Sequence, residues 1–365
     1  MQIVSPYEPL CAPGVLRRLF GRPELGAVAG YLLILIFFAI VARGSGMFSA
    51  AGIINFLEVS AQLGIIAVAA ALLMIGGEFD LSVGSMIGFA GIIVALPAVE
   101  WGVPLWICIL AAFAVALVVG WLNGTIVMRT GLPSFLVTLA GLFILRGLTL
   151  GITRAVTGRT QIPGLREAIE GDWLAPLFAG KVGEDLMQWM ADMGWIAARP
   201  DGVPLASGIP VSILWWLLLT ALATWVLLRT RIGNWIFACG GDANAARNLG
   251  VPVGKVKTGL FMFTALAATI FALVQTLSVG SADVLRGQLK EFEAIIAAVI
   301  GGCLLTGGYG SAIGAAFGAL IFGTVQMGIF YTGVNTDWFK VFLGVMMLIA
   351  VLFNNYVRRK ATEGR

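Results

Sequence analysis

Long apolar segments separated by short polar ones run through this chain of 365 residues. Read in windows of about 19 residues, the length that crosses a bilayer as a helix, they predict about ten transmembrane helices. The predicted helices occupy roughly residues 25–43, 52–75, 82–99, 104–128, 132–152, 210–229, 256–278, 292–306, 309–331 and 338–357. The pattern therefore predicts an all-α, polytopic membrane protein.

These helices also divide the chain into segments. A cytoplasmic N-terminal segment, 1–24, precedes the first five helices in 25–153; an outer loop, 154–209, precedes the last five in 210–357; and a cytoplasmic tail, 358–365, follows. We expect two pseudo-repeated halves, because many transporters are built from inverted repeats. Residues 83–96 and 309–322 share a Gly-Ser-x-Ile-Gly start. Both would begin a helix on the same side of the membrane, so we interpret this match as shared small-residue packing.

A broken helix is predicted near residues 76–82. The stretch IGGEFDLSVG places Glu78 and Asp80 between two apolar helices, with glycines on both sides that permit non-helical backbone. Such backbone is tolerated at membrane depth only where it is buried in protein or lines a water-filled cavity. Asp80 or Ser82 could therefore cap the next helix, or the two carboxylates could line the inner end of a translocation path. The sequence leaves both interpretations open.

Composition and charge placement agree with a membrane location. Hydrophobic residues make up 59% of the chain and charged residues 12%, whereas roughly a quarter of a soluble domain is charged. With the N-terminus inside, the inner segments hold Arg17, Arg18, Arg22, Arg129, Arg229, Arg231, Arg247, Lys255, Lys257, Arg358, Arg359, Lys360 and Arg365. The short outer segments hold Arg43, Arg286, Lys290 and Lys340. Because Lys and Arg concentrate in cytoplasmic loops, we expect both termini in the cytoplasm.

The outer loop 154–209 is long and of mixed polarity. Its stretch EDLMQWMADMGW places Leu186, Trp189, Met190 and Met193 on one helical face, which predicts an amphipathic helix on the membrane surface. The loop would be either a lid over helix ends or a docking surface for an external partner, since long loops are often functional.

The longest inner loop, 229–257, contains a short alanine-rich helix. DANAARNLG has Asp242 placed to cap this helix, and Gly250 followed by Pro252 ends it. The segment is either an ordinary basic loop or a protruding helix that docks on a cytosolic partner.

No catalytic constellation is visible in the sequence. The chain has no histidine, which excludes Ser-His-Asp and Cys-His arrangements. GVPVGKV lacks the spacing of a phosphate-binding loop, and Val256 stands where a hydroxyl would bind magnesium. Cys11, Cys108, Cys239 and Cys303 lie far apart, which is typical of apolar fillers and not of a metal site. We expect a non-enzymatic chain without a cofactor or metal of its own.

Four motifs, in this order along the chain, resemble the permease subunits of bacterial ABC importers of the ribose/xylose type. GGEFDLSVGS is similar to the GG-x-DLSVG signature of that family. TGLPSFLVTLAGLFILRGL also fits, and RTRIGNWIFACGGDANAARNLGV resembles the family's RTR-x-G…EAAR-x-x-G-[IV] loop, with Asn244 where the family often has Glu. EFEAIIAAVIGGCLLTGGYGSAIGAAFGALIFG is similar to its E-x-x-AIAAVVIGG segment.

This resemblance implies ten helices in each subunit and import of a monosaccharide or similar small polyol across the bacterial inner membrane. The implied partners are a cytosolic ABC ATPase that binds ATP and magnesium, a periplasmic sugar-binding protein, a second permease copy and the lipid bilayer, with no nucleic acid. The inner loop would dock into the ATPase through Arg231, Gly233, Gly240, Gly241, Asp242, Ala245, Ala246, Arg247 and Gly250.

Small, weakly polar side chains would suit the path of a sugar that an external protein selects. Candidates for this path or for the helix break are Gly76, Gly77, Glu78, Asp80, Ser82, Ser85, Asn55 and Gln62. The alternatives are a branched-chain amino acid permease of an ABC importer, an ATP-independent secondary sugar transporter and a channel-like protein. The DLSVG motif favours sugars over the first. The inner loop and the scarcity of buried charge count against the secondary transporter, and the inner loop counts against a channel.

Overall fold

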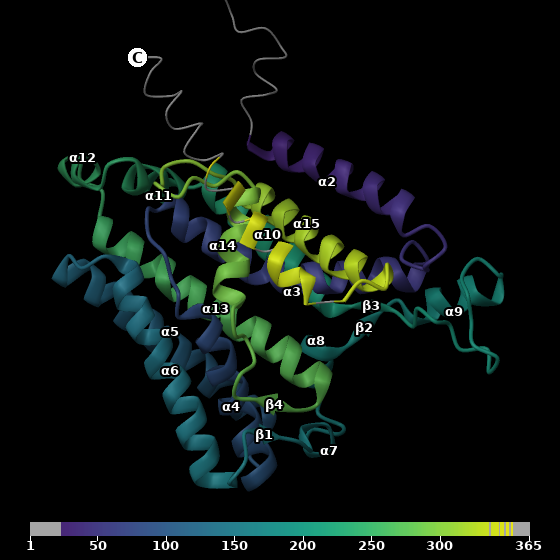
Figure 1. Ribbon diagram of the computed structural model, residues 1–365. Coiled ribbons are helices and arrows are strands. Elements are labelled where there is room, and N and C mark those ends of the chain that lie inside the picture. The colour runs from purple at the N-terminus through teal and green to yellow at the C-terminus, as the bar shows by residue number, and fades with distance from the viewer. Residues whose placement is uncertain (1–22, 336, 343, 347, 350–351, 353–365) are drawn as a thin grey trace, which may run out of the picture.

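The computed structural model describes residues 23–335, 337–342, 344–346, 348–349 and 352 (Figure 1). Several expectations lie outside these residues: most of the segment 1–24, part of the tenth predicted helix 338–357, and the whole tail 358–365. The basic residues Arg17, Arg18, Arg22, Arg358, Arg359, Lys360 and Arg365 lie there too, as does Cys11.

Seven helices in the described part of the chain are long and apolar enough to cross a membrane. They are α3 (Ala50–Ile75), α4 (Val83–Trp101), α5 (Leu105–Thr130), α6 (Ser134–Thr157), α10 (Val211–Arg229), α13 (Val253–Val279) and α15 (Ala312–Tyr331). A further helix, α2 (Pro23–Val41), has a shorter apolar part, Leu25–Val41. Each of these helices matches a predicted one to within a few residues, so the prediction of a helical, polytopic protein is confirmed.

The eighth predicted helix, 292–306, is shorter in the structure than predicted. The structure has α14 (Lys290–Ile300) there, with 11 residues. At 1.5 Å per residue such a helix is about 16 Å long, roughly half the thickness of a hydrocarbon core. Gly301 and Gly302 end it, so the apolar residues that follow belong to a turn. A hydropathy window does not distinguish an apolar turn from a helix.

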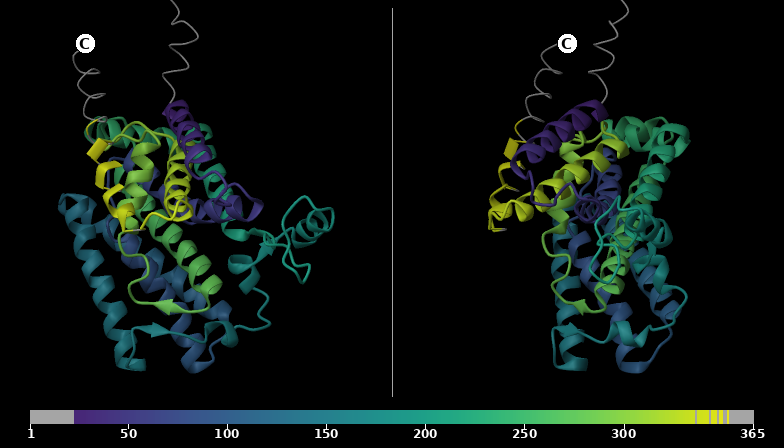
Figure 2. Two further views of the ribbon diagram at one scale, coloured as in Figure 1. Left: turned by 45° about the vertical axis from the view of Figure 1, so that its right-hand side comes forward. Right: turned by 90° about the vertical axis from the view of Figure 1, so that its right-hand side faces the viewer.

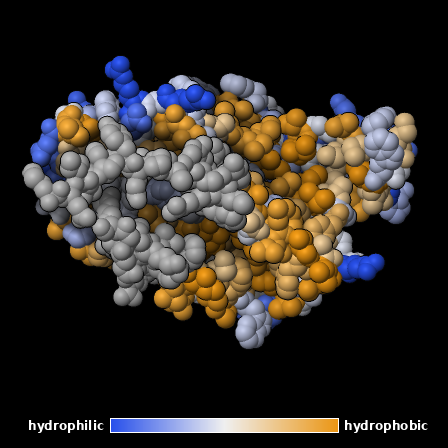
Figure 3. All heavy atoms as spheres, turned by 90° about the horizontal axis from the view of Figure 1, so that it is seen from above, coloured by the Kyte–Doolittle hydropathy of each residue, from blue (hydrophilic) through white to orange (hydrophobic). Residues whose placement is uncertain are grey.

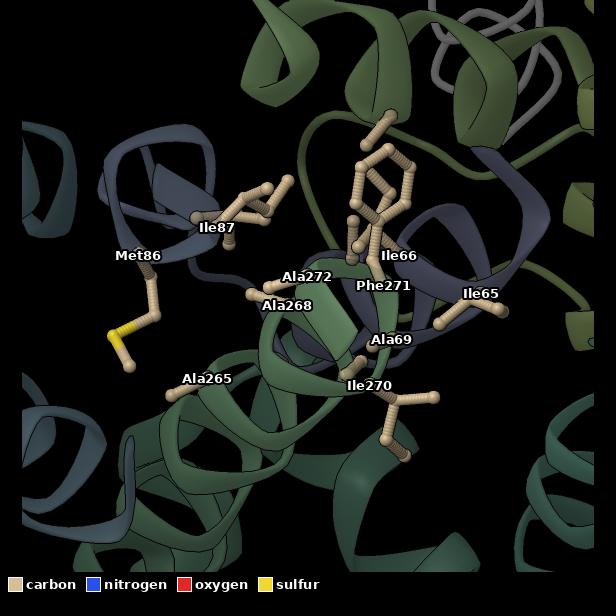
Figure 4. Packing of buried hydrophobic residues seen from close by; sticks show 14 of the residues in the cluster. Ile65, Ile66, Ala69, Met86, Ile87, Ala265, Ala268, Ile270, Phe271 and Ala272 are labelled. Atoms are coloured by element: carbon tan, nitrogen blue, oxygen red, sulfur yellow. The ribbon is translucent and has the colours of Figure 1, made fainter. Parts of the chain in front are cut away.

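The centre of the molecule is built from α3, α4, α13 and α15. In the most apolar windows of α3 and α13, 78% of the residues are buried, against 22% in α6, so α6 lies at the periphery. Small side chains let the central helices approach closely, because lipid-embedded helices associate mainly by packing. Ala268 and Ala272 of α13 lie on the side facing the helix that carries Met86 and Ile87 (Figure 4).

Two glycines on α5 allow this helix to pack closely against α13. A Cβ added at Gly120 would lie 2.5 Å from the Met262 Cα, and one added at Gly124 would lie 2.6 Å from the Thr258 Cα. No side chain fits at such distances, so the two backbones are in direct contact. The four-residue spacing is the small-xxx-small pattern of packed membrane helices.

Apolar side chains cover much of the outer surface. Ile40 on α2, Phe143 on α6 and Leu228 on α10 are 71%, 65% and 67% exposed. Seen from above, hydrophobic residues occupy a broad area of the molecule (Figure 3). A patch of this extent is typical of a surface covered by lipid or by another protein, which agrees with a multi-pass membrane protein.

A short strand pair connects the two halves of the chain at the end of the molecule away from α11 (Arg231–Gly241) and α12 (Ala243–Asn248) (Figure 1). Strand β1 (Gln161–Ile162) follows α6 and pairs antiparallel with β4 (Ala282–Asp283), which follows α13. The Gln161 amide donates to Asp283 Oδ2 at 2.6 Å. Beyond β1, the N–H at the start of α7 (Leu165–Ala168) donates to the Gly280 carbonyl at 3.2 Å. The outer loop is thereby held against the end of α13.

The rest of the outer loop leaves the helical body through a narrow neck. After α8 (Ala175–Ala179), β2 (Lys181–Val182) pairs antiparallel with β3 (Ile209–Pro210), so the chain departs and returns at one place. We call the residues between these strands, 183–208, the excursion; it projects sideways from the helices (Figure 2).

The excursion contains the predicted amphipathic helix. It is α9 (Glu184–Asp192), which ends three residues before the predicted end at residue 195 because the backbone turns at Met193 and Gly194. Leu186 and Trp189 on its apolar face are 53% and 45% exposed. Its position on a membrane surface stays a prediction.

Candidate functional site

The break between α3 and α4 is the first part of the candidate site. Residues 76–82 are non-helical, as predicted. Gly76 donates its N–H to the Leu72 carbonyl at 3.0 Å and Gly77 donates to the Met74 carbonyl at 2.9 Å, which closes α3. Gly77 has a φ of +82°, a left-handed conformation that favours glycine at a helix end.

Side chains of α6 satisfy the backbone beyond these glycines. The Phe79 N–H donates to Ser134 Oγ at 3.1 Å, and the Leu81 N–H donates to Thr138 Oγ1 at 3.0 Å. Ser134 and Thr138 are both buried and lie four residues apart, so they share one face of α6. These two N–H groups of the break are therefore bonded within the protein, as non-helical backbone requires wherever water does not reach it.

The Asp80 carboxylate is bonded to α13 directly and is linked to α5 through Ser82. Oδ1 accepts the Ser82 N–H at 2.9 Å and the Ser82 hydroxyl at 2.5 Å, and Oδ2 accepts the Thr264 hydroxyl of α13 at 2.8 Å. The Asn123 amide of α5 donates to Ser82 Oγ at 3.0 Å. The sequence predicts that Asp80 or Ser82 caps α4. Ser82 precedes α4, but its hydroxyl bonds Asp80 and not the first turn, whereas Asp80 accepts the N–H of Ser82 just before the helix.

These contacts predict different effects for two Asp80 variants. Asp80→Leu is expected to destabilise the protein by about 1–3 kcal/mol, because Ser82 and Thr264 lose a buried acceptor. Asp80→Asn is expected to have nearly the same melting temperature in detergent as the unmodified protein. Its Nδ2 can donate to Thr264 Oγ1, and the Thr264 hydroxyl can then donate to the Phe261 carbonyl, which lies 2.8 Å away in the present structure. Normal melting of Asp80→Asn with lost transport would instead favour a path-lining charge.

Glu78 forms a buried ion pair across the break. Its Oε1 lies 2.6 Å from Lys257 Nζ of α13, and the two side chains are 12% and 9% exposed. The distribution of basic residues along the sequence places Lys257 in an inner segment and indicates no partner for it; in the structure it is a buried residue of α13. The first turns of α13 lie against the end of α3, so the long lysine side chain reaches inward to the carboxylate.

The inner loop forms the second part of the site as two capped helices. Thr230 Oγ1 accepts the Gly233 N–H at 3.2 Å at the start of α11. Asp242 Oδ1 accepts the N–H groups of Asn244 and Ala245 at 2.8 and 3.0 Å at the start of α12, so the predicted Asp242 cap is confirmed. The sequence did not predict α11, which is stabilised by packing of buried Ile236 against the core.

The predicted docking residues separate into an outer and an inner set. Arg231, Gly241, Asp242, Ala245, Arg247 and Gly250 are exposed, Gly233 and Ala246 are buried, and Gly240 is half-buried. Leu249, at the end of α12, is 84% exposed. Sequence reasoning missed this residue, although an apolar side chain in a polar loop beside Gly250 was a usable signal.

Cysteines near the site are buried, as expected for apolar fillers. Cys108, Cys239 and Cys303 are free thiols with exposures of 2%, 2% and 1%. Burial raises the pKa of the Cys239 thiol on α11, and the charge of Lys257 partly opposes that shift. Cys239 therefore remains a neutral thiol within the packing of α11.

Of the remaining path candidates, Ser85 lies beside the break, whereas Gln62 and Asn55 lie farther along α3. Ser85 lies in the first turn of α4, is 4% exposed, and has no hydrogen-bond partner for its Oγ among the described residues. Gln62 accepts from the Gln275 amide at 3.3 Å, and Asn55 donates to the Tyr331 hydroxyl at 3.1 Å. Gln62 lies 13 positions before Ile75, about 20 Å along α3, so the structure does not bring these residues together.

Four residues that support the break were not among the sequence-based candidates. Ser134, Thr138, Asn123 and Thr264 bond the break or its supports. Each is a polar residue inside an apolar helix, which indicates an internal hydrogen bond, but its partner is distant in sequence.

Comparisons with known proteins cover almost the whole chain. The family model described as "Branched-chain amino acid transport system / permease component" matches residues 52–351. The xylose transport system permease protein XylH of Escherichia coli (strain K12) is 31% identical over 368 residues, covering 92% of each chain. The ribose import permease protein RbsC of the same strain is 30% identical, covering 93% of this chain and 97% of that protein. The fructose import permease protein FrcC of Rhizobium meliloti is 28% identical, covering 90% and 84%. No solved structure matches the chain.

Proposed function

The chain belongs to the family of permease components of ATP-binding cassette (ABC) importers, and from this premise we propose that it imports a monosaccharide or a similar small polyol. It is a membrane transport subunit, and ATP hydrolysis belongs to a separate ATPase. The main support for a sugar as the transported molecule is that 90–93% of the chain is similar to permeases named for xylose, ribose and fructose. The description of the family model makes branched-chain amino acids the second candidate.

The proposed assembly contains two copies of this chain in a bacterial inner membrane, with both termini in the cytoplasm and about ten spans in two related halves. Supporting this, α13 begins beside α11 and α12 and ends at β4, at the opposite end of the molecule (Figure 1). Residues 284–300 then lead back toward the end that holds α11 and α12 (Figure 1). In the proposed count, α14 and the turns on either side of it therefore form one broken span. A periplasmic binding protein would deliver the cargo at the β1–β4 end.

The proposed ATPase contact is formed by α11 and α12. Both helices lie at one end of the helical body (Figure 1). Their exposed surface carries charged residues and two large apolar side chains, Ile232 on α11 and Leu249 at the end of α12. The ATPase would hold ATP and magnesium, so no cofactor is assigned to this chain.

We assign Glu78 and Asp80 to holding the helix break and not to binding cargo. Both carboxylates are bonded to other side chains within the protein, Glu78 to Lys257 and Asp80 to Ser82 and Thr264. Ser85 keeps an unbonded hydroxyl among the described residues and is the better candidate to contact a passing hydroxylated molecule.

Transport in proteoliposomes tests the proposal. The chain is reconstituted with its ATPase and binding protein, and uptake of radiolabelled xylose, ribose, fructose and leucine is measured. We expect ATP-dependent uptake of at least one sugar and no leucine uptake, with a non-hydrolysable ATP analogue as the control. Leucine uptake without sugar uptake would identify an amino acid importer, and sugar uptake without ATP a secondary transporter.

A further inference from the structure

Two helix ends, one in each half of the chain, close with the same hydrogen bonds. Both helices end in the sequence Ile-Gly-Gly, at residues 75–77 and 300–302. In α3, the N–H groups of Gly76, Gly77 and Glu78 donate to the carbonyls of Leu72, Met74 and Leu73; in α14, those of Gly301, Gly302 and Cys303 donate to the carbonyls of Ala297, Val299 and Ala298. The second glycine has a φ of +82° in the first end and +91° in the second. The turn 301–311 is therefore a second helix break, closed like the first.

The two breaks are in direct contact with each other. The Gly308 N–H, in the second break, donates to the Ile75 carbonyl at the end of α3 at 2.8 Å. A Cβ added at Gly307 would lie 2.7 Å from the Gly77 Cα, so the two turns pack backbone against backbone.

The end of α11 lies at this same contact. A Cβ added at Gly240 would lie 1.8 Å from the Ile75 carbonyl oxygen and 2.5 Å from the Gly308 nitrogen. A Cβ added at Gly307 would also lie 2.9 Å from the Gly240 carbonyl oxygen. We call these meeting backbones of Ile75–Gly77, Gly240 and Gly307–Gly308 the glycine junction.

Direct backbone contact makes the junction stiff. Protein interiors are close-packed, so a shift of one element displaces its neighbours, and here no flexible side chain lies between them to absorb it. The next residue, Gly241, is exposed, and a Cβ added there would meet no described atom within 4 Å. A side chain at Gly240 would therefore point into the junction and one at Gly241 away from it, although the Gly241 backbone borders the second break: a Cβ added at Gly308 would lie 3.0 Å from the Gly241 Cα.

We infer that the turn 301–311 is a second coupling element, and that Gly240, Gly307 and Gly308 are positioning residues for ATP-driven transport. This inference rests on the proposed docking of α11 and α12 on the ATPase. A displacement of α11 on nucleotide binding is passed through the glycine junction to the end of α3 and to the turn before α15 at once. Both helix breaks, one from each half of the chain, then move together.

A pair of matched variants tests the junction. Gly240→Ala adds a methyl group into the junction, whereas Gly259→Ala adds the same methyl group on α13, outside the proposed ATPase contact, where an added Cβ meets no described atom within 4 Å. In the full assembly with ATPase and binding protein, we expect Gly240→Ala to keep ATPase co-purification but to lower the sugar transported per ATP hydrolysed by about tenfold. Gly259→Ala is expected to stay within about twofold of the unmodified assembly. Equal ratios for the two variants would overturn the inference.

Hydrogen exchange on the unmodified assembly gives a second test, which holds even if Gly240→Ala fails to fold. Exchange is followed by mass spectrometry with and without a non-hydrolysable ATP analogue. We expect the peptides covering 76–82 and 301–311 to change protection together, at the same nucleotide concentration, while the β2–β3 neck stays constant. A change in α11 and α12 with none in 301–311 would contradict the inference. Failure of the unmodified assembly to transport sugar with ATP would instead refute the proposed function.

Discussion

Lys257→Met is expected to lower the free energy of unfolding by about 3–5 kcal/mol, one of the largest effects of any single substitution in this chain. The ammonium group of Lys257 is the ion-pair partner of Glu78, and both side chains are almost completely buried. Removing the lysine leaves a carboxylate inside the protein without its counter-charge. The check is the melting temperature of the detergent-purified protein, with helical circular dichroism as the signal.

Two further variants test whether the loss of stability comes from breaking the buried ion pair or from losing any positive charge. Lys255→Met removes an exposed charge two residues earlier in α13 and is expected to leave the melting temperature nearly unchanged. The double variant Glu78→Leu with Lys257→Met removes both charges, and we expect most of the lost stability to return, because buried ion pairs are often replaceable by apolar residues. A double variant as unstable as Lys257→Met alone would contradict this account of the pair.

Leu249→Asp is expected to weaken binding of the ATPase by about thirtyfold, corresponding to about 2 kcal/mol. Leu249 is 84% exposed at the end of α12, and exposed apolar side chains at a protein contact often provide much of its binding energy. The substitution removes no packing within the described chain, so the amount of folded protein should not change. The measurement is the affinity of the purified permease for the ATPase, together with ATP-driven uptake.

Asn248→Asp is the matched control for this surface. It introduces the same charge one residue earlier, also at an exposed position, but leaves the leucine in place. We expect ATPase binding within about threefold of the unmodified protein, as for a peripheral contact. Equal losses in both variants would assign the effect to charge, and no loss in Leu249→Asp would place the ATPase contact elsewhere.

Hydropathy predicts the long helices well because each crosses the bilayer as one apolar run. It fails at α14, where the apolar run continues through Gly301 and Gly302 while the helix ends. The glycines themselves were visible in the sequence. What ends the helix there is the bonding of their N–H groups to the last turn, which a sliding average does not register.

The candidate site was predictable only where its interactions are local. The Asp242 cap bonds residues two and three positions away and follows from the sequence. The pairing of Glu78 with Lys257 spans 179 positions, and counting the charges in loops does not indicate that this lysine has a partner. The glycine junction is harder still to predict from the sequence, because the contact of Gly240 with Ile75 and Gly308 forms only when three distant segments fold to one place.

The narrow neck of the outer loop has a consequence for how such chains diversify. Residues 183–208 leave and return between β2 and β3, and the paired strands fix both ends of the excursion. Insertions, deletions and substitutions within it can therefore accumulate without moving α8 or α10. If the excursion binds an external partner, the choice of partner can change through replacement of residues 183–208 alone. The sequence of the membrane-embedded helices need not change with it.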